Sequence, residues 1–555
     1  MGRQLKSGEE APPARKFRRR VVVVLLLLLI AGHGAYFFYL SPELSRAFSH
    51  VPDGVEYTLA MQNLLDGHGY TLHLNGVDYP SRYQPWFSLL FVAPALLFAG
   101  GNVLCAWFGC FASGVVAIFA AFELGRRLGG VWCGLLLASV LGVFADFARF
   151  ANVVMTEVPY TMLVIFAAVR WLKLCGRTET RTSDYLLFGL WCALAGALRS
   201  TALVLSGIVL LPLVKRRPRP AAAAKSLAAA WLPSLAVAAA NLVYNKLVFG
   251  EFLRSGYHFW EPLPYDYPEL TFGWKILVGN LSAYATRLNL WYLLIPALVF
   301  VSFRLWGRPA PEAAKKLDAY ALFVAAVAGI TAAVYLPYFS VQERFFLPVR
   351  TLLMFGAAAA AAVAVASNFR KAAPAALGVA SLLLSFAPWP DPGAEQQPHD
   401  RLRSAKIATL CRISETLPEN AVLLTVFQQG AAEYFFAGRS ARRIIPMYRC
   451  YEYAQMVTAP RRVPPPPGGF SAIEDQNSRR YIADHGGARP YPLVFSEAPE
   501  RIDALISSGT PVYVTSYTPM VSTYAYRVLS KRYRGVPAPR GDAPFAVFRL
   551  LPLDK

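Results

Sequence analysis

Long apolar runs separated by short basic segments dominate the chain up to about residue 390. The first run, Val21–Leu40, is apolar except for His33 and about 20 residues long, which is enough for a helix to cross a bilayer. It is longer than the apolar core of a secretory signal peptide, and no small-residue cleavage site follows it. We therefore expect an uncleaved first transmembrane helix.

Further apolar runs predict more membrane-spanning helices. They are Asn102–Leu124, Val131–Phe147, Val158–Leu174, Ala221–Val243, Leu290–Phe303, Leu322–Leu336, Pro348–Ala366 and Pro374–Ala387. The run Tyr185–Val214 is about 30 residues long, too long for one span, and Arg199-Ser200 interrupts its middle. It predicts a hairpin of two short helices with Arg199 at a sunken tip. The total is about eleven spans.

The run Trp86–Phe98 is apolar but too short to span, and it predicts a helix that lies at the membrane interface. It belongs to a long loop, residues 41–101, that follows the first span. A second long loop, residues 244–288, precedes the span Leu290–Phe303.

Basic clusters indicate the orientation of the chain. The clusters are Arg18-Arg19-Arg20, Arg126-Arg127, Lys215-Arg216-Arg217 and Arg370-Lys371, and all fall on one side of the predicted spans. By the positive-inside rule this side is cytoplasmic. The N-terminus is then expected in the cytoplasm, the loop 41–101 outside, and the protein in a bacterial inner (cell) membrane.

Residues 390–555 have shorter apolar runs and more proline and polar residues. Buried strands are predicted at Val422–Val426, Arg443–Ile445 and Val512–Thr515, with helices at Ala431–Phe436 and Glu500–Ile506. This alternation favours a small α/β domain on the outer side. Cys411 and Cys450 lie in it, but two cysteines are too few to predict a disulfide.

Composition supports the membrane class. Hydrophobic residues make up 55% of the 555 residues and charged residues 16%, and the mean hydropathy is +0.37, which is too apolar for an ordinary soluble protein. The net charge of +21 comes from the segments between the spans. No nucleic-acid-binding motif accompanies it, so binding of nucleic acid is not expected.

Ionisable residues of both signs gather on the predicted outer side. They are Asp53, Glu56, His68, Arg82, Asp146, Arg149, Glu157, Arg199, His258, Glu343 and Arg344. Arginine binds phosphate through two parallel hydrogen bonds, and a carboxylate acts as a general base or holds a divalent metal. This mixture suits a donor with a phosphate leaving group and an acceptor hydroxyl. Because nucleotide donors are confined to the cytoplasm, a lipid-linked phosphate donor is expected.

Several motifs occur in a fixed order on this side. The first loop holds Asp53-x-x-x-Tyr57, Asn63-Leu64-Leu65-x-Gly67-x-Gly69-Tyr70 and Tyr83-x-Pro85, and later segments hold Met155-Thr156-Glu157-Val158-Pro159-Tyr160, Leu198-Arg199-Ser200-Thr201-Ala202 and Glu343-Arg344-Phe345-Phe346-Leu347-Pro348. Together they resemble GT-C glycosyltransferases, in the group of the protein O-mannosyltransferases, the aminoarabinose transferases of lipid A and the rhizobial lipopolysaccharide glycosyltransferases. The resemblance covers residues 20–390.

The resemblance implies inverting transfer of a sugar from a polyprenyl-phosphate carrier to a hydroxyl of a glycan, lipid or protein acceptor. It implies that Asp53 is the catalytic base. Many members have a second acid directly after this Asp, where this chain has Gly54. Glu56 or Glu157 is therefore the expected second carboxylate, and it would assist Asp53. Alternatively, Asp53 and Glu157 together would hold a divalent metal, Mg or Mn.

The remaining expected roles concern the substrates. The lipid phosphate is expected on Arg199, Arg344 and Arg82, and the sugar or acceptor on Tyr57, His68, Tyr257 and His258. The expected organisation is a basic cytoplasmic tail (1–20), a GT-C-like transmembrane catalytic domain (21–389) and an extracytoplasmic α/β domain (390–555).

Two other function classes stay open at this point. A transporter or flippase also needs charged residues within its helices, but these usually lie near the middle of the bilayer in a repeated fold. A non-catalytic scaffold or sensor would use the outer domain for binding and would not need Asp53.

Overall fold

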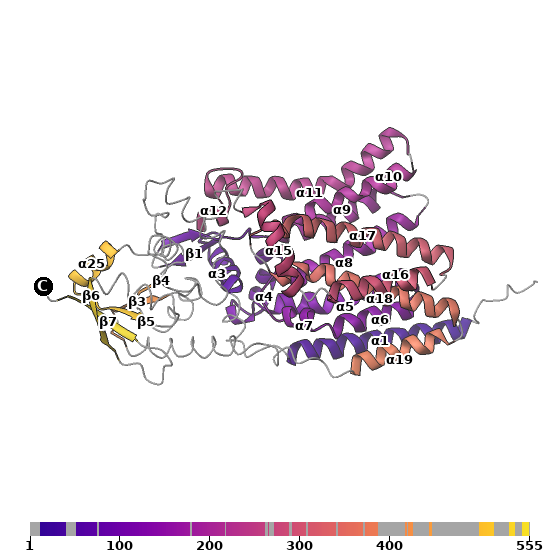
Figure 1. The fold of residues 1–555 in the computed structure, drawn as a ribbon, viewed down its shortest axis with the longest axis horizontal. Coiled ribbons are helices and arrows are strands. Elements are labelled where there is room, and N and C mark those ends of the chain that lie inside the picture. The colour runs from indigo at the N-terminus through magenta and orange to yellow at the C-terminus, as the bar shows by residue number, and fades with distance from the viewer. Residues whose placement is uncertain are drawn as a thin grey trace, which may run out of the picture.

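The computed structural model describes residues 12–39, 52–386 and, in the C-terminal part, 417–425, 443–446, 499–515, 532–538 and 547–553, with short gaps at 75–76, 178–179, 217, 261–264, 266–270, 288–290, 307–308, 340–341, 370–371 and 419. Helices that run side by side form an elongated bundle, and a short hairpin, several short helices and the C-terminal strands lie at one end of it (Figure 1).

Five helices of the described part are long and apolar enough to cross a membrane, or six if a bent pair counts as one span. The five are α5 (Phe108–Gly129), α8 (Glu157–Gly176), α11 (Pro220–Phe249), α17 (Pro311–Tyr335) and the helix Glu343–Asn368, made of the 3₁₀ turn η4 (Glu343–Phe346) and α18 (Leu347–Asn368). Shorter apolar helices are α1 (Pro12–Tyr39, apolar over Arg20–Tyr36), α9 (Thr182–Leu198) and α16 (Trp291–Trp306). A multi-span helical protein is thus confirmed, and the count of eleven stays a prediction.

The bent pair corresponds to the predicted run Val131–Phe147. It consists of α6 (Val131–Gly142) and α7 (Ala145–Ala151), which meet at 68°. Phe144 between them has an extended backbone, and no side-chain hydrogen bond caps the start of α7. The last predicted span is the helix α19 (Ala373–Phe386).

The predicted hairpin at 185–214 is confirmed. Helix α9 ends at Leu198, Arg199 has an extended backbone, and the chain returns as a 3₁₀ helix, η3 (Ser200–Val209), and α10 (Leu210–Arg216). The two arms lie so close that a Cβ on Gly196 would meet the Leu203 side chain at 2.3 Å. A side chain at this position would displace the Leu203 side chain and would lie 3.1 Å from its backbone nitrogen, so glycine favours the tight return.

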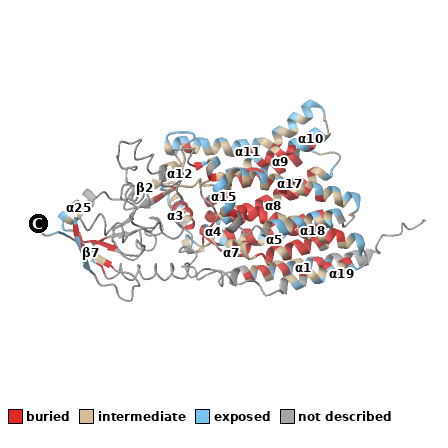
Figure 2. Cartoon of the chain, in the orientation of Figure 1, coloured by how far each residue is buried: buried red, intermediate tan, exposed pale blue. Residues whose placement is uncertain are grey.

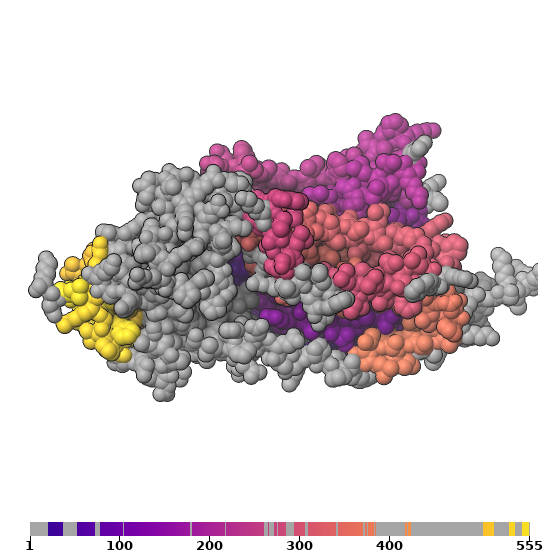
Figure 3. All heavy atoms as spheres, in the orientation of Figure 1, coloured from indigo at the N-terminus to yellow at the C-terminus, as the bar shows by residue number. Residues whose placement is uncertain are grey.

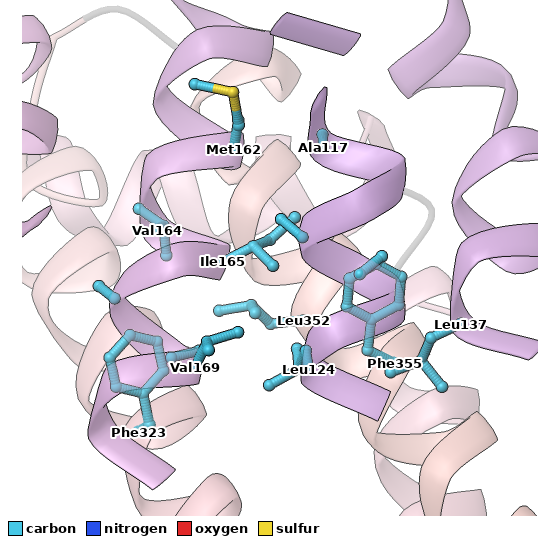
Figure 4. Close-up of a cluster of buried hydrophobic side chains, with 14 of the residues drawn as sticks. Ala117, Leu124, Leu137, Met162, Val164, Ile165, Val169, Phe323, Leu352 and Phe355 are labelled. Carbon is cyan, nitrogen blue, oxygen red and sulfur yellow. The ribbon is translucent and has the colours of Figure 1, made fainter. Parts of the chain in front are cut away.

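The core lies where α5, α6, α8, α17 and α18 pack together, with Leu124, Ile165, Phe323 and Phe355 among its fully buried side chains (Figure 4). Helices α5 and α6 approach closely: a Cβ on Gly125 would lie 2.6 Å from the Cys133 carbonyl oxygen. Small residues permit such close approach in membrane helices.

By contrast, α11 has an apolar and largely exposed surface (Figure 2). Leu232, Leu235 and Leu247 on it are exposed. Within a membrane this face would meet lipid rather than water.

The described part of the loop that is predicted to be outside, residues 41–101, starts with helix α3 (Pro52–Leu65), followed by an antiparallel hairpin of β1 (Thr71–Leu74) and β2 (Val77–Pro80). The predicted interface helix Trp86–Phe98 is confirmed as a helical segment, with a π-helical stretch η1 (Ser88–Val92) continuing into α4 (Ala93–Phe98). A 3₁₀ turn, η2 (Val103–Cys105), precedes α5. Gln84 and Trp86 donate hydrogen bonds to Asn245 and Asn241 of α11, which fix the loop to the bundle.

The second long loop, residues 244–288, contains α12 (Gly256–Trp260) and α15 (Trp274–Arg287) in its described part. Asn280 of α15 donates to the carbonyl oxygens of Leu336 and Tyr338, at 2.9 and 2.6 Å. Helix α15 thereby holds the segment that leads from α17 to η4.

The described residues of the C-terminal part form a five-stranded sheet in the order β4-β3-β5-β7-β6. Its strands are β3 (Val422–Thr425), β4 (Arg443–Pro446), β5 (Val512–Thr515), β6 (Tyr533–Pro537) and β7 (Val547–Pro552), with helix α25 (Pro499–Ser507) before β5. Strand β3 is parallel to β4 and β5, and β7 is antiparallel to β5 and β6.

Three predicted strands and the predicted helix Glu500–Ile506 are therefore confirmed. The predicted helix Ala431–Phe436 and both Cys411 and Cys450 lie outside the described residues. Strands β5, β6 and β7 (yellow) lie beyond the end of the bundle that carries α3 and β1 (Figures 1 and 3). The extracytoplasmic location of this part stays a prediction.

Candidate functional site

Helix α3 places two of the predicted carboxylates. It begins at Pro52, so that Asp53 lies in its first turn and Glu56 follows three residues later on the same face. Between them, a Cβ on Gly54 would lie 2.8 Å from the carbonyl oxygen of Val154. The position where the resemblance leads one to expect a second acid is therefore closed by backbone packing, and glycine is needed there.

Asp53 lies between two arginines. Its Oδ1 accepts a hydrogen bond from Arg82 Nη2 at 3.1 Å, and its Oδ2 accepts one from Arg344 Nη2 at 3.3 Å. Burial acts to raise the pKa of this carboxyl, but the two guanidinium groups outweigh burial and hold the pKa below its usual value. Asp53 is therefore ionised at neutral pH.

Glu56 has a different environment. Its Oε1 accepts hydrogen bonds from the Arg82 backbone N–H at 2.6 Å and from the Ser81 hydroxyl at 3.2 Å, and its Oε2 lies 3.2 Å from Arg82 Nη2. Burial raises the pKa of Glu56, and these contacts oppose the shift only in part. The two carboxyl groups on α3 are thus shifted in opposite directions, as in sites that divide acid and base roles.

Glu157 is the first residue of α8, and its side chain is 0% exposed. Its Oε1 accepts a hydrogen bond from Arg199 Nη2 at 2.5 Å and lies 3.5 Å from Arg344 Nε. Arg199 Nε also donates to the Thr156 hydroxyl at 3.3 Å. Within the described residues, Glu157 Oε2 and Arg199 Nη1 are buried and have no hydrogen-bond partner. A donor and an acceptor are therefore left for a group that enters the site.

These contacts form one network in which the charges alternate. It runs Arg82–Asp53–Arg344–Glu157–Arg199, with Glu56 attached to Arg82. Its members are up to 291 residues apart in sequence. All six residues predicted for catalysis or for phosphate binding are members, so the structure brings them together in one site; their roles stay proposals.

Aromatic rings adjoin the network on the Arg82 side. The Arg82 guanidinium lies 4.7 Å from the Tyr83 ring centre and 5.8 Å from that of Tyr257. Tyr57 stacks on Tyr83 with ring centres 4.3 Å apart. Tyr265 lies 4.9 Å from Tyr257. Of the predicted sugar-contacting residues, Tyr57 and Tyr257 therefore lie beside the charged network.

The two predicted histidines are placed differently. His258 lies 5.9 Å from the ring of Tyr265, and its Nδ1 is 3.0 Å from the Ser255 hydroxyl, next to the aromatic group. His68 is exposed on the turn after α3, where its backbone N–H donates to the Asn63 carbonyl oxygen at 2.9 Å, and it has no contact with the network among the described residues. The role predicted for His68 stays a prediction.

Sequence reasoning missed two contributors and one ion pair. Gln342, whose Oε1 accepts from Arg344 Nε at 2.5 Å, and Ser81 at Glu56 are uncharged loop residues without a sequence signal. Arg350 of α18 pairs with Asp146 at 2.5 Å. A lone arginine in an apolar run is the same signal that identified Arg199, so Arg350 could have been found.

The arrangement does not fit a divalent metal held by Asp53 and Glu157. The described residues contain no group of three or more His, Cys, Asp or Glu side chains that could hold a metal ion. Arg344 contacts both carboxylates, with nitrogens 3.3 Å from Asp53 and 3.5 Å from Glu157. A guanidinium therefore already supplies the positive charge between them.

Comparison with solved structures gives similarity over the whole chain. ArnT from Cupriavidus metallidurans bound to undecaprenyl phosphate matches with a TM-score of 0.55 and 12% identity, covering 95% of this chain and 97% of that chain. The apo state of the same protein matches with a TM-score of 0.49, 13% identity and coverage of 97% and 98%. The Archaeoglobus fulgidus oligosaccharyltransferase in its apo form matches with a TM-score of 0.48, 11% identity and coverage of 97% and 75%.

No protein-family model and no curated protein matches the sequence. ArnT and the oligosaccharyltransferase are glycosyltransferases of the GT-C fold. The likeness to ArnT with its lipid shows that this chain has the same fold, as the sequence motifs predicted; at 12% identity it shows the fold alone.

Proposed function

We propose that this protein of the GT-C fold is a membrane glycosyltransferase. It moves a sugar from a polyprenyl-phosphate donor to an acceptor hydroxyl at the outer face of the membrane, with inversion. The observation that carries the proposal is the buried network of three arginines and three carboxylates, assembled at one end of the helices from distant segments.

The arginines supply the phosphate site. Arg82, Arg344 and Arg199 are three permanently charged donors within one network, and a guanidinium matches the geometry of a phosphate group. Arg199 has a buried nitrogen without a hydrogen-bond partner among the described residues. That nitrogen can bind a phosphate oxygen with no loss of an existing contact. ArnT of the same fold is bound to undecaprenyl phosphate, which supports a polyprenyl-phosphate donor here.

Asp53 acts as the base. The acceptor oxygen attacks the anomeric carbon from the face opposite the phosphate, so the configuration inverts. The bond from the anomeric carbon to the phosphate oxygen breaks, and that oxygen keeps the electron pair. The acceptor proton passes to Asp53 and then to the departing phosphate monoester or to solvent. Phosphate on Arg82 and Arg344 competes with Asp53 for the guanidinium groups and therefore makes Asp53 a stronger base.

The other two carboxylates hold the arginines in position. Glu56 fixes Arg82 through its backbone N–H and its guanidinium, and Glu157 fixes Arg199 and contacts Arg344. Neither role requires a metal, and no step of the reaction is assigned to one.

Tyr57, Tyr83 and Tyr257 are proposed to face the sugar. Aromatic rings beside a catalytic site offer flat apolar surface to the C–H face of a pyranose or pentose ring. Their position beside Arg82 supports this, because the sugar is attached directly to the phosphate.

Replacing Asp53 by Asn tests the proposal. Purified wild-type protein in nanodiscs is incubated with a panel of polyprenyl-phosphate sugars and acceptors, and release of polyprenyl phosphate is measured. We expect Asp53→Asn to lower turnover by about 10²- to 10⁴-fold, the usual contribution of a general base. Asp66→Asn, an exposed acid after the end of the same helix, is the control and should turn over normally. Normal turnover in Asp53→Asn would refute the catalytic assignment.

A further inference from the structure

The charges of the network balance. Arg82, Arg344 and Arg199 face the carboxylates of Asp53, Glu56 and Glu157. Their side chains are between 0% and 24% exposed. In this largely buried and internally neutral cluster each charge lies close to an opposite charge, and this attraction offsets the cost of removing the charges from water.

A phosphate group entering this cluster disturbs the balance. A donor phosphodiester carries one negative charge, so the site that was neutral becomes singly negative. An uncompensated charge in a buried site is costly, and the usual response is a change in protonation. A cation could compensate as well, but Arg344 already contacts both Asp53 and Glu157.

Glu56 is the carboxylate best suited to take up a proton. The ionisable groups that face it are Arg82, Asp53 and Tyr70, together with the Ser81 hydroxyl. Arg82 is its one cationic partner among them, and Arg82 Nη2 is shared with Asp53, at 3.1 Å from Asp53 and 3.2 Å from Glu56. When a phosphate oxygen binds the Arg82 guanidinium, the attraction between this guanidinium and the Glu56 carboxylate is weakened.

A protonated Glu56 keeps its structural contacts. Its Oε1 still accepts from the Arg82 backbone N–H and from Ser81, while the proton sits on Oε2, which faces the guanidinium. Burial already raises the pKa of Glu56, whereas the pKa of Asp53 is lowered, so that Glu56 is the easier of the two to protonate.

We propose that binding of the lipid-linked phosphodiester is coupled to the uptake of one proton from solvent by the Glu56 carboxylate. This inference rests on the proposed function and deepens it, since it assigns Glu56 the task of keeping the loaded site neutral. Asp53 thereby stays ionised and available as the base while the donor is bound.

The proposal predicts that removing one carboxylate, in Glu56→Gln, strengthens binding of the phosphodiester at high pH. In wild-type protein the association constant should fall about tenfold for each unit of rising pH over the range in which Glu56 is ionised when free and protonated when bound. In Glu56→Gln the network has one net positive charge before the ligand arrives. This variant should bind the phosphodiester with little pH dependence, and more tightly than wild type at the upper end of the range.

The experiment is isothermal titration calorimetry of the full-length protein in nanodiscs with the methyl ester of undecaprenyl phosphate. This probe is singly charged at every pH used, so it takes up no proton itself. Titrations in two buffers of different ionisation enthalpy, with a chelator present, give the number of protons taken up. Glu123→Gln, which removes a carboxylate at the far, predicted cytoplasmic end of α5, is the matched control and should behave as wild type.

Uptake of about one proton by wild type that vanishes in Glu56→Gln supports the proposal. Binding without proton uptake overturns it. Proton uptake that persists in Glu56→Gln also overturns it, because another carboxylate then carries the proton. Failure of wild type to bind the probe at any pH is a separate result, which argues against the polyprenyl-phosphate donor and so against the proposed function.

Discussion

Replacing Glu157 by glutamine should remove a large part of the stability of the helical core, although the side chain keeps its size. Glu157 is fully buried, with Oε1 2.5 Å from Arg199 Nη2. In this variant Arg199 faces only neutral hydrogen-bond acceptors among its described contacts, the glutamine side-chain oxygen and the Thr156 hydroxyl, and its charge is no longer compensated by residue 157. Two unit charges about 4 Å apart attract by about 4 kcal/mol at an effective dielectric constant of about 20. Breaking a buried pair costs about 3–5 kcal/mol in measured cases, which agrees with this value.

Thermal unfolding of the detergent-solubilised protein measures the loss. Cys110, Cys133 and Cys192 are buried free thiols, so a thiol-reactive fluorophore reports unfolding as they become accessible. The matched control is Asp318→Asn, which breaks the pair with Arg304 at 2.8 Å; there the side chains are 57% and 30% exposed. An exposed pair contributes about 1 kcal/mol at most.

A double substitution completes the test. In Glu157→Gln with Arg199→Gln no unpaired charge remains, so the double variant should be more stable than the sum of the single losses predicts, with a coupling energy of about 1–3 kcal/mol. If Glu157→Gln unfolds at the same temperature as Asp318→Asn, or if the single losses simply add, the buried pair does not stabilise the site and the reasoning is wrong.

Four further predictions concern residues of the same site. The lowered pKa of Asp53 means that its contribution to stability is present above its unfolded value, near pH 3.8, and is lost as the pH falls through the folded value; Asp53→Asn should therefore lower the melting temperature at neutral pH but not in strong acid. The pKa of Glu56 is raised, so the sign is opposite. Its contribution is present below about pH 4.5 and is lost as the pH rises through the folded value, so the melting temperature of wild type should fall relative to that of Glu56→Gln as the pH rises. Melting curves against pH that show the same sign for both variants would contradict this. Gly54→Ala places a Cβ 2.8 Å from the Val154 carbonyl oxygen and should lower both the melting temperature and the turnover. The control is Gly329→Ala in α17, where nothing lies within 4 Å of the new Cβ, and it should gain up to about 1 kcal/mol of helix stability. Equal effects of the two substitutions would mean that α3 does not need this close contact. Arg344→Lys keeps the charge but loses the planar fork whose separate nitrogens contact Asp53 on one side and Glu157 and Gln342 on the other, so kcat/KM for the lipid donor should fall about tenfold or more, while Arg304→Lys should leave it unchanged.

Helix positions followed well from the apolar runs. The hairpin at 185–214 was predictable because a run of about 30 apolar residues exceeds one span and an arginine in its middle favours a break. The strands at 422–425, 443–446 and 512–515 were predictable because short β-branched runs flanked by polar residues favour strands. The bend between α6 and α7 was not predictable, because the run is uniformly apolar across Val143 and Phe144.

The meaning of Gly54 also changed with the structure. In the sequence it looked like the loss of a second catalytic acid beside Asp53. In the fold it marks the place where α3 touches the backbone of Val154. Such a contact involves two segments far apart in sequence, so no local pattern could indicate it.

By itself the sequence determined that the chain spans a membrane, where its helices lie, and which ionisable residues gather near one face. These properties depend on local apolar periodicity and on the cost of charge in lipid, and both can be evaluated residue by residue. Only the tertiary structure decided which charged side chains form ion pairs. Arg344 lies between Asp53 and Glu157, and Glu56 pairs with Arg82. Asp146 pairs with Arg350 outside the site. Ion pairs are decided at distances of about 3 Å between segments as much as 291 residues apart, and that geometry exists only after the helices have packed.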